Sequence, residues 1–492
     1  MELVLPQIDW APFAPLLPVA LGGLTALVAE LFLPPGRKHL IAILSLIALA
    51  ASILLSISSW GPVLDPDQGM VRYGLHDAVV LDRFSLFFYL MLGLIGILTV
   101  LLSMGYLDTA AADQGEYYSL VLFSALGMML MAAGGDLIVI FLGLETFSLG
   151  LYTLAGFWKT ELRSNESALK YLLLGAFASG FFLYGIALIY GATGTTVLRQ
   201  IAAFLADGHP PAPLFLIGGG LLLVGFGFKI ASVPFHMWAP DVYEGAPTSI
   251  TAFMIAGTKA AAFAAFLRVF LLAVPSLHVQ WLVAIWVLAV LTMTVGNLVA
   301  LVQSNIKRML AYSSIAHAGY LLVALVAGGS SGVAGILFYL VAYALMNLGV
   351  FAVIIALQGH ERERLLLTDY AGLGWQRPVL AACMAVFMFS LAGIPPTAGF
   401  MGKLYIFSAA LEGDYPGLAV IGVLNSVVSV YFYLRVIVIM YMSDAASPPS
   451  LVPASAAAVL AVVVSVLGTL HLGLFPARLL DLARQSVSAI TG

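Results

Sequence analysis

The sequence predicts an all-α, polytopic integral membrane protein with about 14 transmembrane helices. Of its 492 residues, 62% are hydrophobic and only 9% are charged, whereas an average soluble domain is about 45–50% apolar and about 25% charged. The apolar runs are also long enough, since a spanning helix needs about 20 residues. Runs this long and uniform are helices, because barrel strands are shorter and alternate in polarity. The composition therefore excludes a soluble enzyme.

The predicted spans are apolar runs that end at proline, glycine or charged residues. In chain order they are 12–33, 39–60, 80–106, 115–133, 136–158, 167–191, 213–239, 246–273, 279–302, 308–328, 332–357, 378–410, 417–442 and 453–475. We interpret the first run as a permanent span, because Glu2 and Asp9 stand where a cleavable signal would carry positive charge.

Charge and cysteine content exclude several kinds of site. The formal net charge is −4, so the chain has no basic field that would bind nucleic acid. A single cysteine, Cys383, rules out a disulfide framework, a cysteine-ligated zinc site and an iron–sulfur cluster. We therefore expect no metal and no cofactor in this chain.

The orientation follows from the loop charges, because lysine and arginine resist translocation. One side carries Arg37, Lys38, Lys159, Arg163, Lys170, Lys307, Arg308, Arg362, Arg364 and Arg377, and the other carries Arg72, Arg83, Arg199, Arg478 and Arg484. The richer side is expected to face the cytoplasm. With an even number of spans, both termini are then on the outer side of the membrane, and the first loop is in the cytoplasm.

Two short similarities indicate an internal repeat, and the alternative is chance matching in so apolar a sequence. FKIASVP at 228–234 matches FSLAGIP at 389–395, and FLRV at 266–269 matches YLRV at 433–436. Each block would hold five spans, an odd number, so the second copy would be inverted, as in many secondary transporters. The predicted units are an N-terminal three-helix segment (1–114), two repeats (115–273 and 279–442) and a C-terminal helix (443–492).

The prolines within two of the spans predict interrupted helices. Pro234 falls inside the seventh span and Pro395-Pro396 inside the twelfth. Proline removes a backbone donor and clashes with the preceding turn, so each helix should kink or break.

Four charged residues lie near the centres of predicted spans: Glu145, Lys229, Lys259 and Lys403. A charge at that depth costs at least about 2.5–3.5 kcal/mol and usually marks an ion path. The protonation of a lysine responds to its hydration and to nearby carboxylates, so this series is a candidate proton relay. The structural alternatives are a static Glu–Lys salt bridge, a spacer role for Lys259 and a snorkelling Lys403.

Other polar residues within the spans have less specific interpretations. His236 and His317 are either relay groups or ordinary packed histidines. Arg268 and Arg435 lie nearer to span ends, and we expect them to snorkel as anchors.

Four long segments resemble the antiporter-like N-type membrane subunits of respiratory complex I, the proton-pumping NADH:quinone oxidoreductase. They are GLETFSLGLYTL around Glu145, FKIASVPFHMWAPDVYEGAPTSITAF at 228–253, NIKRMLAYSSIAHAGYLL at 305–322 and AGIPPTAGFMGKLYIF at 392–407. Lys403 in place of a glutamate, and the end of the sequence soon after the fourteenth span, distinguish it from the related M and L subunits.

The resemblance implies a role for each candidate residue. Glu145 and Lys229 would be the family's glutamate–lysine pair, Lys259 the central lysine, Lys403 the terminal lysine, and His317 a polar relay group. The subunit would translocate protons without redox chemistry of its own. NADH, FMN, iron–sulfur clusters and quinone would be bound elsewhere in a complex with other membrane-arm and peripheral-arm subunits. The alternatives are an Mrp-type cation/proton antiporter and a passive spacer of the membrane arm.

Overall fold

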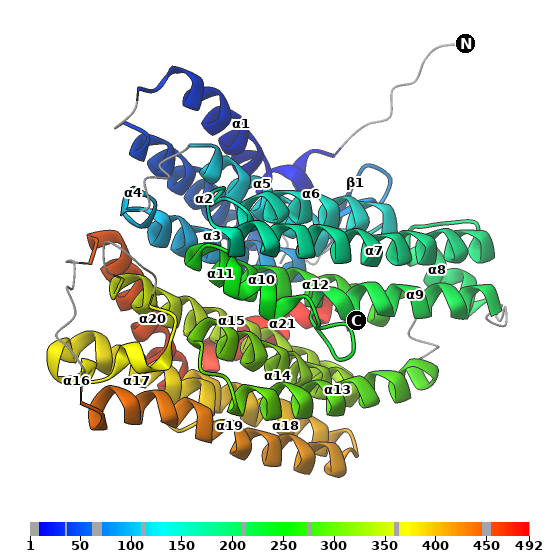
Figure 1. The fold of residues 1–492 in the computed structure, drawn as a ribbon. Coiled ribbons are helices and arrows are strands. Elements are labelled where there is room, and N and C mark those ends of the chain that lie inside the picture. The colour runs from blue at the N-terminus through cyan, green and yellow to red at the C-terminus, as the bar shows by residue number, and fades with distance from the viewer. Residues whose placement is uncertain are drawn as a thin grey trace.

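The computed structural model describes residues 9–34, 37–61, 71–109, 115–207, 213–273, 278–358, 364–444 and 454–491. Within them, eleven helices are long and apolar enough to span a membrane, and three more apolar helices are shorter. Together they equal the predicted number of spans. The chain is a multi-pass membrane protein, and its helices run roughly parallel to one another across Figure 1.

The N-terminal segment consists mainly of two apolar helices, a small hairpin and a buried third helix. Its elements are α1 (Leu17–Phe32), α2 (His39–Trp60), β1 (Arg72–Gly74), β2 (Val79–Leu81), α3 (Arg83–Ser103) and α4 (Tyr106–Thr109). The strands pair antiparallel, with Tyr73 opposite Val80. Asp82 caps α3 by accepting a hydrogen bond from the backbone N–H of Ser85.

The first repeat begins at α5 and ends with a helix that contains π-helical turns. Its elements are α5 (Glu116–Ala133), α6 (Leu137–Ala155), α7 (Leu162–Thr193), α8 (Leu198–Ala206), α9 (Pro213–Lys229), α10 (Ala239–Gly245), α11 (Thr248–Phe253), the π-helix η3 (Met254–Thr258), α12 (Lys259–Arg268) and the π-helix η4 (Val269–Ala273). The predicted break at Pro234 is confirmed, since α9 ends at Lys229 and α10 starts only at Ala239. The predicted end of this span at residue 239 is wrong, because a second, short helix, α10, begins at Ala239 and continues to Gly245.

The second repeat follows the same order of elements. It consists of α13 (His278–Leu301), α14 (Ile306–Ala327), α15 (Gly329–Ala356), the 3-10 turn η6 (Leu367–Tyr370), α16 (Leu373–Gln376), α17 (Pro378–Ala392), α18 (Ala398–Glu412) and α19 (Pro416–Met442). Here the predicted twelfth span separates into α17 and α18 on either side of Pro395-Pro396. In Figure 1 this block lies below the first one, and α10 and α11 contact α14 and α15 across the boundary.

Matching end contacts support the internal repeat. Asp136 caps α6 and Asn305 caps α14, and each forms an isolated β-bridge to a residue beyond the next helix. The arginines of the FLRV and YLRV motifs both donate to carbonyls at the end of the first helix of their own block. Arg268 donates to the carbonyl of Ala132 (3.2 Å), and Arg435 donates to that of Leu301 (3.0 Å).

The segment 443–492, predicted to hold one helix, holds two in its described part. The helix α20 (Ala456–Leu474) packs on α15, α18 and α3, and α21 (Ala477–Thr491) packs on α15 and α3. Pro476 separates them, because proline has no backbone N–H to donate and so cannot continue the helix. These two helices connect the second repeat with the N-terminal segment.

Candidate proton-relay site

The first candidate residue, Glu145, lies on α6 and faces α7. Its carboxylate accepts a hydrogen bond from the hydroxyl of Ser179, and its side chain is half-buried. Ser148 lies one helical turn further along α6. Residues three apart on a helix share a face, so Glu145 and Ser148 point to the same side.

Lys229 binds Ser148 rather than Glu145. Its Nζ donates to Ser148 Oγ at 2.7 Å, and the side chain is only 2% exposed. In the described part of the chain, Lys229 forms no direct ion pair with Glu145, although their charges still interact electrostatically. The implied glutamate–lysine pair therefore contains an intervening serine, and it is not a static salt bridge.

Aromatic rings complete the environment of Lys229. Its Nζ lies 5.1 to 5.8 Å from the ring centroids of Phe147, Tyr152, Tyr171 and Phe228. Rings at this distance attract a cation through their negative faces, by about 0.5–2 kcal/mol each. They can therefore hold a charged lysine where a carboxylate would otherwise be needed.

The side chain of Lys259, a residue of the first repeat, contacts the second repeat. It is 2% exposed, and its Nζ donates to both the backbone carbonyl and the hydroxyl oxygen of Ser314 on α14. The ring centroid of Tyr343 on α15 lies 5.1 Å from the same nitrogen. Lys259 starts α12 directly after the π-helix η3, and π-helical turns are frequent at functional sites.

His317 stands between Lys259 and Lys403 without contacting either. It is 1% exposed, and its ring nitrogens bind the hydroxyls of Tyr339 and Tyr433. Its ring centroid is 5.1 Å from that of Tyr343 and 5.6 Å from that of Tyr320.

Lys403 occupies the break between α17 and α18. Its Nζ donates to the carbonyls of Leu391 and Ala392, both at 3.0 Å, and to Ser426 Oγ at 2.8 Å. These carbonyls lack helical partners because α17 ends at Ala392. The side chain is 4% exposed and lies over the Tyr320 ring, so it does not snorkel.

His236 lies apart from these contacts. It lies in the break after α9 and is half-buried. Of the other predicted site residues, which we call the relay residues, Glu145 is half-buried, and the buried ones are Lys229, Lys259, His317 and Lys403. The structure does not bring His236 into hydrogen-bond contact with them.

An aromatic bridge connects the surroundings of Lys229 with those of Lys259. Tyr171 stacks on Trp238 with 4.7 Å between centroids, and Trp238 meets Tyr243 at 5.5 Å. The Tyr243 hydroxyl interacts with the side chain of Thr258, the residue before Lys259. Sequence reasoning missed this bridge, because tyrosine and tryptophan in a helix are indistinguishable from packing residues.

The expectation that Arg268 snorkels is wrong. Arg268 is 1% exposed and forms a bidentate ion pair with Asp82, at 2.8 Å and 3.0 Å. The ring of Phe84 lies 4.9 Å from its guanidinium. An arginine can be buried when a planar carboxylate satisfies it, and the partner here comes from α3, far away in sequence. Arg435, by contrast, is half-buried and donates to the carbonyls of Leu301 and Gln303.

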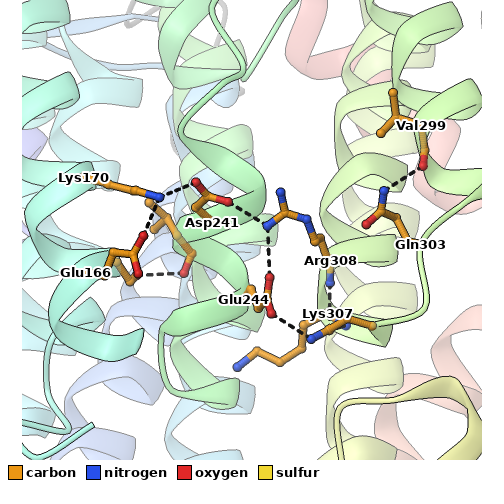
Figure 2. Close-up of polar contacts among 11 residues, drawn as sticks. Glu166, Lys170, Asp241, Glu244, Val299, Gln303, Lys307 and Arg308 are labelled. Carbon is orange, nitrogen blue, oxygen red and sulfur yellow. Dashed lines mark hydrogen bonds and ion pairs between the residues drawn. The ribbon is translucent and has the colours of Figure 1, made fainter. Parts of the chain in front are cut away.

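An ion-pair network joins the two repeats at the end of the bundle that carries the predicted cytoplasmic loops. Figure 2 shows Asp241 on α10 between Lys170 (2.6 Å) and Arg308 (2.7 Å). Arg308 also binds Glu244 at 3.0 Å, and Lys170 also binds Glu166 at 2.6 Å. Although burial acts against it, the hydrogen bonds from Lys170 and Arg308 hold the pKa of Asp241 below its usual value.

More than half of the chain matches the model of a known protein family. Residues 134–429 match the family model described as NADH:quinone oxidoreductase/Mrp antiporter, transmembrane. The chain belongs to this family. The matched range contains Glu145, Lys229, Lys259, His317 and Lys403.

Individual relatives cover nearly the whole chain. A protein of Trichlorobacter lovleyi named NADH-quinone oxidoreductase subunit N is 50% identical over 469 residues, which are 95% of each chain. A chain in the structure of respiratory complex I from Thermus thermophilus with bound aureothin is 37% identical, with a TM-score of 0.78, covering 96% of this chain and 99% of that one. A chain of the Mrp complex from Dietzia has the same fold at 23% identity, with a TM-score of 0.83 and coverage of 98% and 97%.

Proposed function

We propose that this chain is the N-type membrane subunit of a proton-pumping NADH:quinone oxidoreductase, and that the relay residues carry its protons. The observation that carries the proposal is the burial of Lys229, Lys259 and Lys403 at 2–4% exposure, with serine hydroxyls, carbonyls and rings as partners. A purely structural lysine in a membrane is normally neutralised by a carboxylate. Partners that accept a hydrogen bond without supplying a charge leave each lysine free to gain or lose its proton.

The energies are compatible with this role. At an effective dielectric of about 20, two unit charges attract by about 4 kcal/mol at 4 Å and about half of that at 8 Å. Carrying one charge across 100 mV requires about 2.3 kcal/mol. Moving the Glu145 carboxylate relative to Lys229 therefore changes the energy of a proton on Lys229 by an amount comparable to one transfer step.

The order of the residues suggests a horizontal path. Glu145 modulates the protonation of Lys229. Lys229 then exchanges a proton with Lys259 along the aromatic bridge of Tyr171, Trp238 and Tyr243. The buried hydroxyl of Tyr171 has no hydrogen-bond partner among the described residues, so it is suited to binding water there. The proton then passes from Lys259 by way of His317 to Lys403, which releases it at the far end.

The remaining components are assigned to other chains of the complex. NADH, FMN, the iron–sulfur clusters and quinone would be bound by other membrane-arm and peripheral-arm subunits, consistent with the redox activity in the relatives' names. We place the chain in the bacterial cytoplasmic membrane, with both termini outside. The predicted repeat boundaries, 115–273 and 279–442, belong to the same proposal.

Cysteine labelling tests the orientation. After Cys383→Ser, an impermeant thiol reagent should label Lys159→Cys only in inverted vesicles and His76→Cys only in right-side-out cells. Both positions are exposed. The opposite pattern would reverse the proposed topology.

Purification and pumping test the function. The native complex should contain iron–sulfur subunits and NADH:quinone activity, and Lys229→Ala in the assembled complex should lower proton pumping. A purified chain that exchanges sodium for protons without redox partners would support the Mrp-type alternative. Normal assembly with unchanged pumping would support the passive spacer.

A further inference from the structure

His317 is held on both sides by tyrosine hydroxyls that come from different helices. Tyr339 on α15 binds Nδ1, and Tyr433 on α19 binds Nε2 at 3.0 Å. The Tyr433 hydroxyl also bonds to the hydroxyl of Ser313 on α14. All four side chains are at most 1% exposed, so they form a continuous hydrogen-bonded chain shielded from solvent, which we call the tyrosine–histidine chain.

The chemistry of a neutral imidazole gives this chain a direction. One ring nitrogen carries a proton and donates, while the other accepts. One tyrosine must therefore donate to the ring while the other accepts from it. If the ring changes tautomer, both hydroxyls and the bond to Ser313 must reverse together.

Neighbours in the sequence connect the two ends of the tyrosine–histidine chain with the two lysines. Ser313 precedes Ser314, which binds Lys259. At the other end the Tyr339 ring packs against Gly402, where an added Cβ would lie 2.2 Å from Tyr339 Cδ2, and Gly402 precedes Lys403. The rings of Tyr343 and Tyr320 separate His317 from the ammonium groups themselves.

We propose that Tyr339 and Tyr433 are proton-carrying groups of the relay, which pass a proton through His317 between Lys259 and Lys403; this inference rests on the proposed function. In one transfer, Ser313 receives a proton and passes its own hydroxyl proton to the Tyr433 oxygen, and Tyr433 gives its hydroxyl proton to Nε2. The ring then releases the Nδ1 proton to Tyr339, whose hydroxyl proton leaves towards Lys403. One proton enters and one leaves, and no other bond changes.

This arrangement avoids a third full charge between two lysines. A lasting imidazolium at His317 would be repelled by both neighbouring cations, since all three lie in a medium of low dielectric. Concerted transfer places the charge on the ring only briefly. The two hydroxyls are then required for transfer and not only for packing.

The test replaces each hydroxyl in the intact complex, in proteoliposomes. Tyr339→Phe and Tyr433→Phe keep the rings and remove one oxygen each. Each should lower the initial rate of NADH-driven proton pumping at least about tenfold, because positioned proton-transfer groups contribute about 10²–10⁴-fold. The solvent deuterium isotope effect on pumping should rise, because transfer through His317 becomes rate-limiting.

Tyr89→Phe is the matched control. Tyr89 is fully buried on α3, and its hydroxyl has no hydrogen-bond partner in the part of the chain that the structure describes. The pumping rate and isotope effect of the Tyr89→Phe complex should therefore equal those of the wild type. If one phenylalanine variant does not assemble, the other decides, together with Ser313→Ala, which should raise the isotope effect as well.

Two outcomes separate this inference from the proposed function. If Lys259→Met abolishes pumping but both phenylalanine variants pump at more than half the wild-type rate with an unchanged isotope effect, the tyrosine proposal is overturned alone. If Lys259→Met also pumps normally, the proposed relay fails, and the tyrosine proposal fails with it.

Discussion

The buried pair Asp82–Arg268 predicts a large and specific loss of stability when its charge balance is broken. Asp82→Asn removes the charge but keeps a good N-cap for α3, since asparagine caps a helix as well as aspartate. The hydrogen bond that Oδ2 accepts from Arg268 (2.8 Å) is then lost, because an amide nitrogen cannot accept, and the one that Oδ1 accepts (3.0 Å) loses its ionic character. A buried ion pair that loses one partner costs about 3–5 kcal/mol, because the remaining charge stays buried and unpaired.

A double-mutant cycle in detergent measures this effect. Unfolding by a denaturing detergent is followed for the wild type, Asp82→Asn, Arg268→Met and the double variant. Asp82→Asn should lower the free energy of unfolding by about 3–5 kcal/mol, whereas the double variant should regain most of it because no unpaired charge remains. The control is Asp136→Asn at the cap of α6. Its carboxylate binds Thr196 and a backbone N–H, and among the described residues it forms no ion pair. This substitution should cost less than about 1 kcal/mol. Equal effects of Asp82→Asn and Asp136→Asn, with additive behaviour of the pair, would refute the reasoning.

Three further predictions follow from single contacts. The pKa of Asp241 is held below its usual value, so its ionised carboxylate stabilises the fold at neutral pH. The melting temperature of Asp241→Asn should lie below that of the wild type by a constant amount from pH 5 to 8. The difference should close as the pH falls below about 4, the ordinary pKa of an aspartate. A difference that stays constant down to pH 3 would contradict this assignment. Gly393→Ala should lower both stability and pumping. Gly393 has a φ of +87°, and a Cβ there would lie 2.9 Å from the Lys403 side chain. A variant with the pumping rate and melting temperature of the wild type would count against this prediction. Ser148→Ala should reduce pumping about two- to tenfold, since the buried hydrogen bond that it removes from Lys229 is worth about 0.5–1.5 kcal/mol. An unchanged pumping rate would show that Ser148 is only a packing residue.

The sequence was sufficient for the number of spans and for the broken helices. Apolar length decides a transmembrane helix, and Pro234 and Pro395 act locally on their own helices, so both features are encoded by neighbouring residues. The depth of Lys259 and Lys403 was also predictable, because few charges occur in such long apolar runs.

The partners of these lysines were not predictable. Ser314 meets Lys259, and Ser426 meets Lys403, through contacts between helices that are distant in sequence. Serine is common at helix interfaces in membranes, so its type alone carries little information. Ser148 is the exception, since its spacing from Glu145 places it on the same face of α6.

The arginine assignment failed for a related reason. Arg268 lies near a span end, where a long side chain can reach water, and nothing nearby in sequence reveals Asp82. The repeat contained a partial signal: Arg268 and Arg435 occupy matching motifs, and both donate to the end of the first helix in their block. Only the fold shows that one of them also meets a carboxylate.

The most direct test of the central claim is the number of protons pumped per NADH oxidised by the assembled complex carrying Lys259→Met. The matched control is Lys307→Met, because Lys307 is equally buried and also donates to a carbonyl, that of Ala246, but lies in the first turn of α14, outside the predicted spans. The relay predicts a lower ratio, or coupled turnover reduced at least about tenfold, for Lys259→Met and a normal ratio and turnover for Lys307→Met. A wild-type ratio and rate with Lys259→Met in a fully assembled complex would contradict the account.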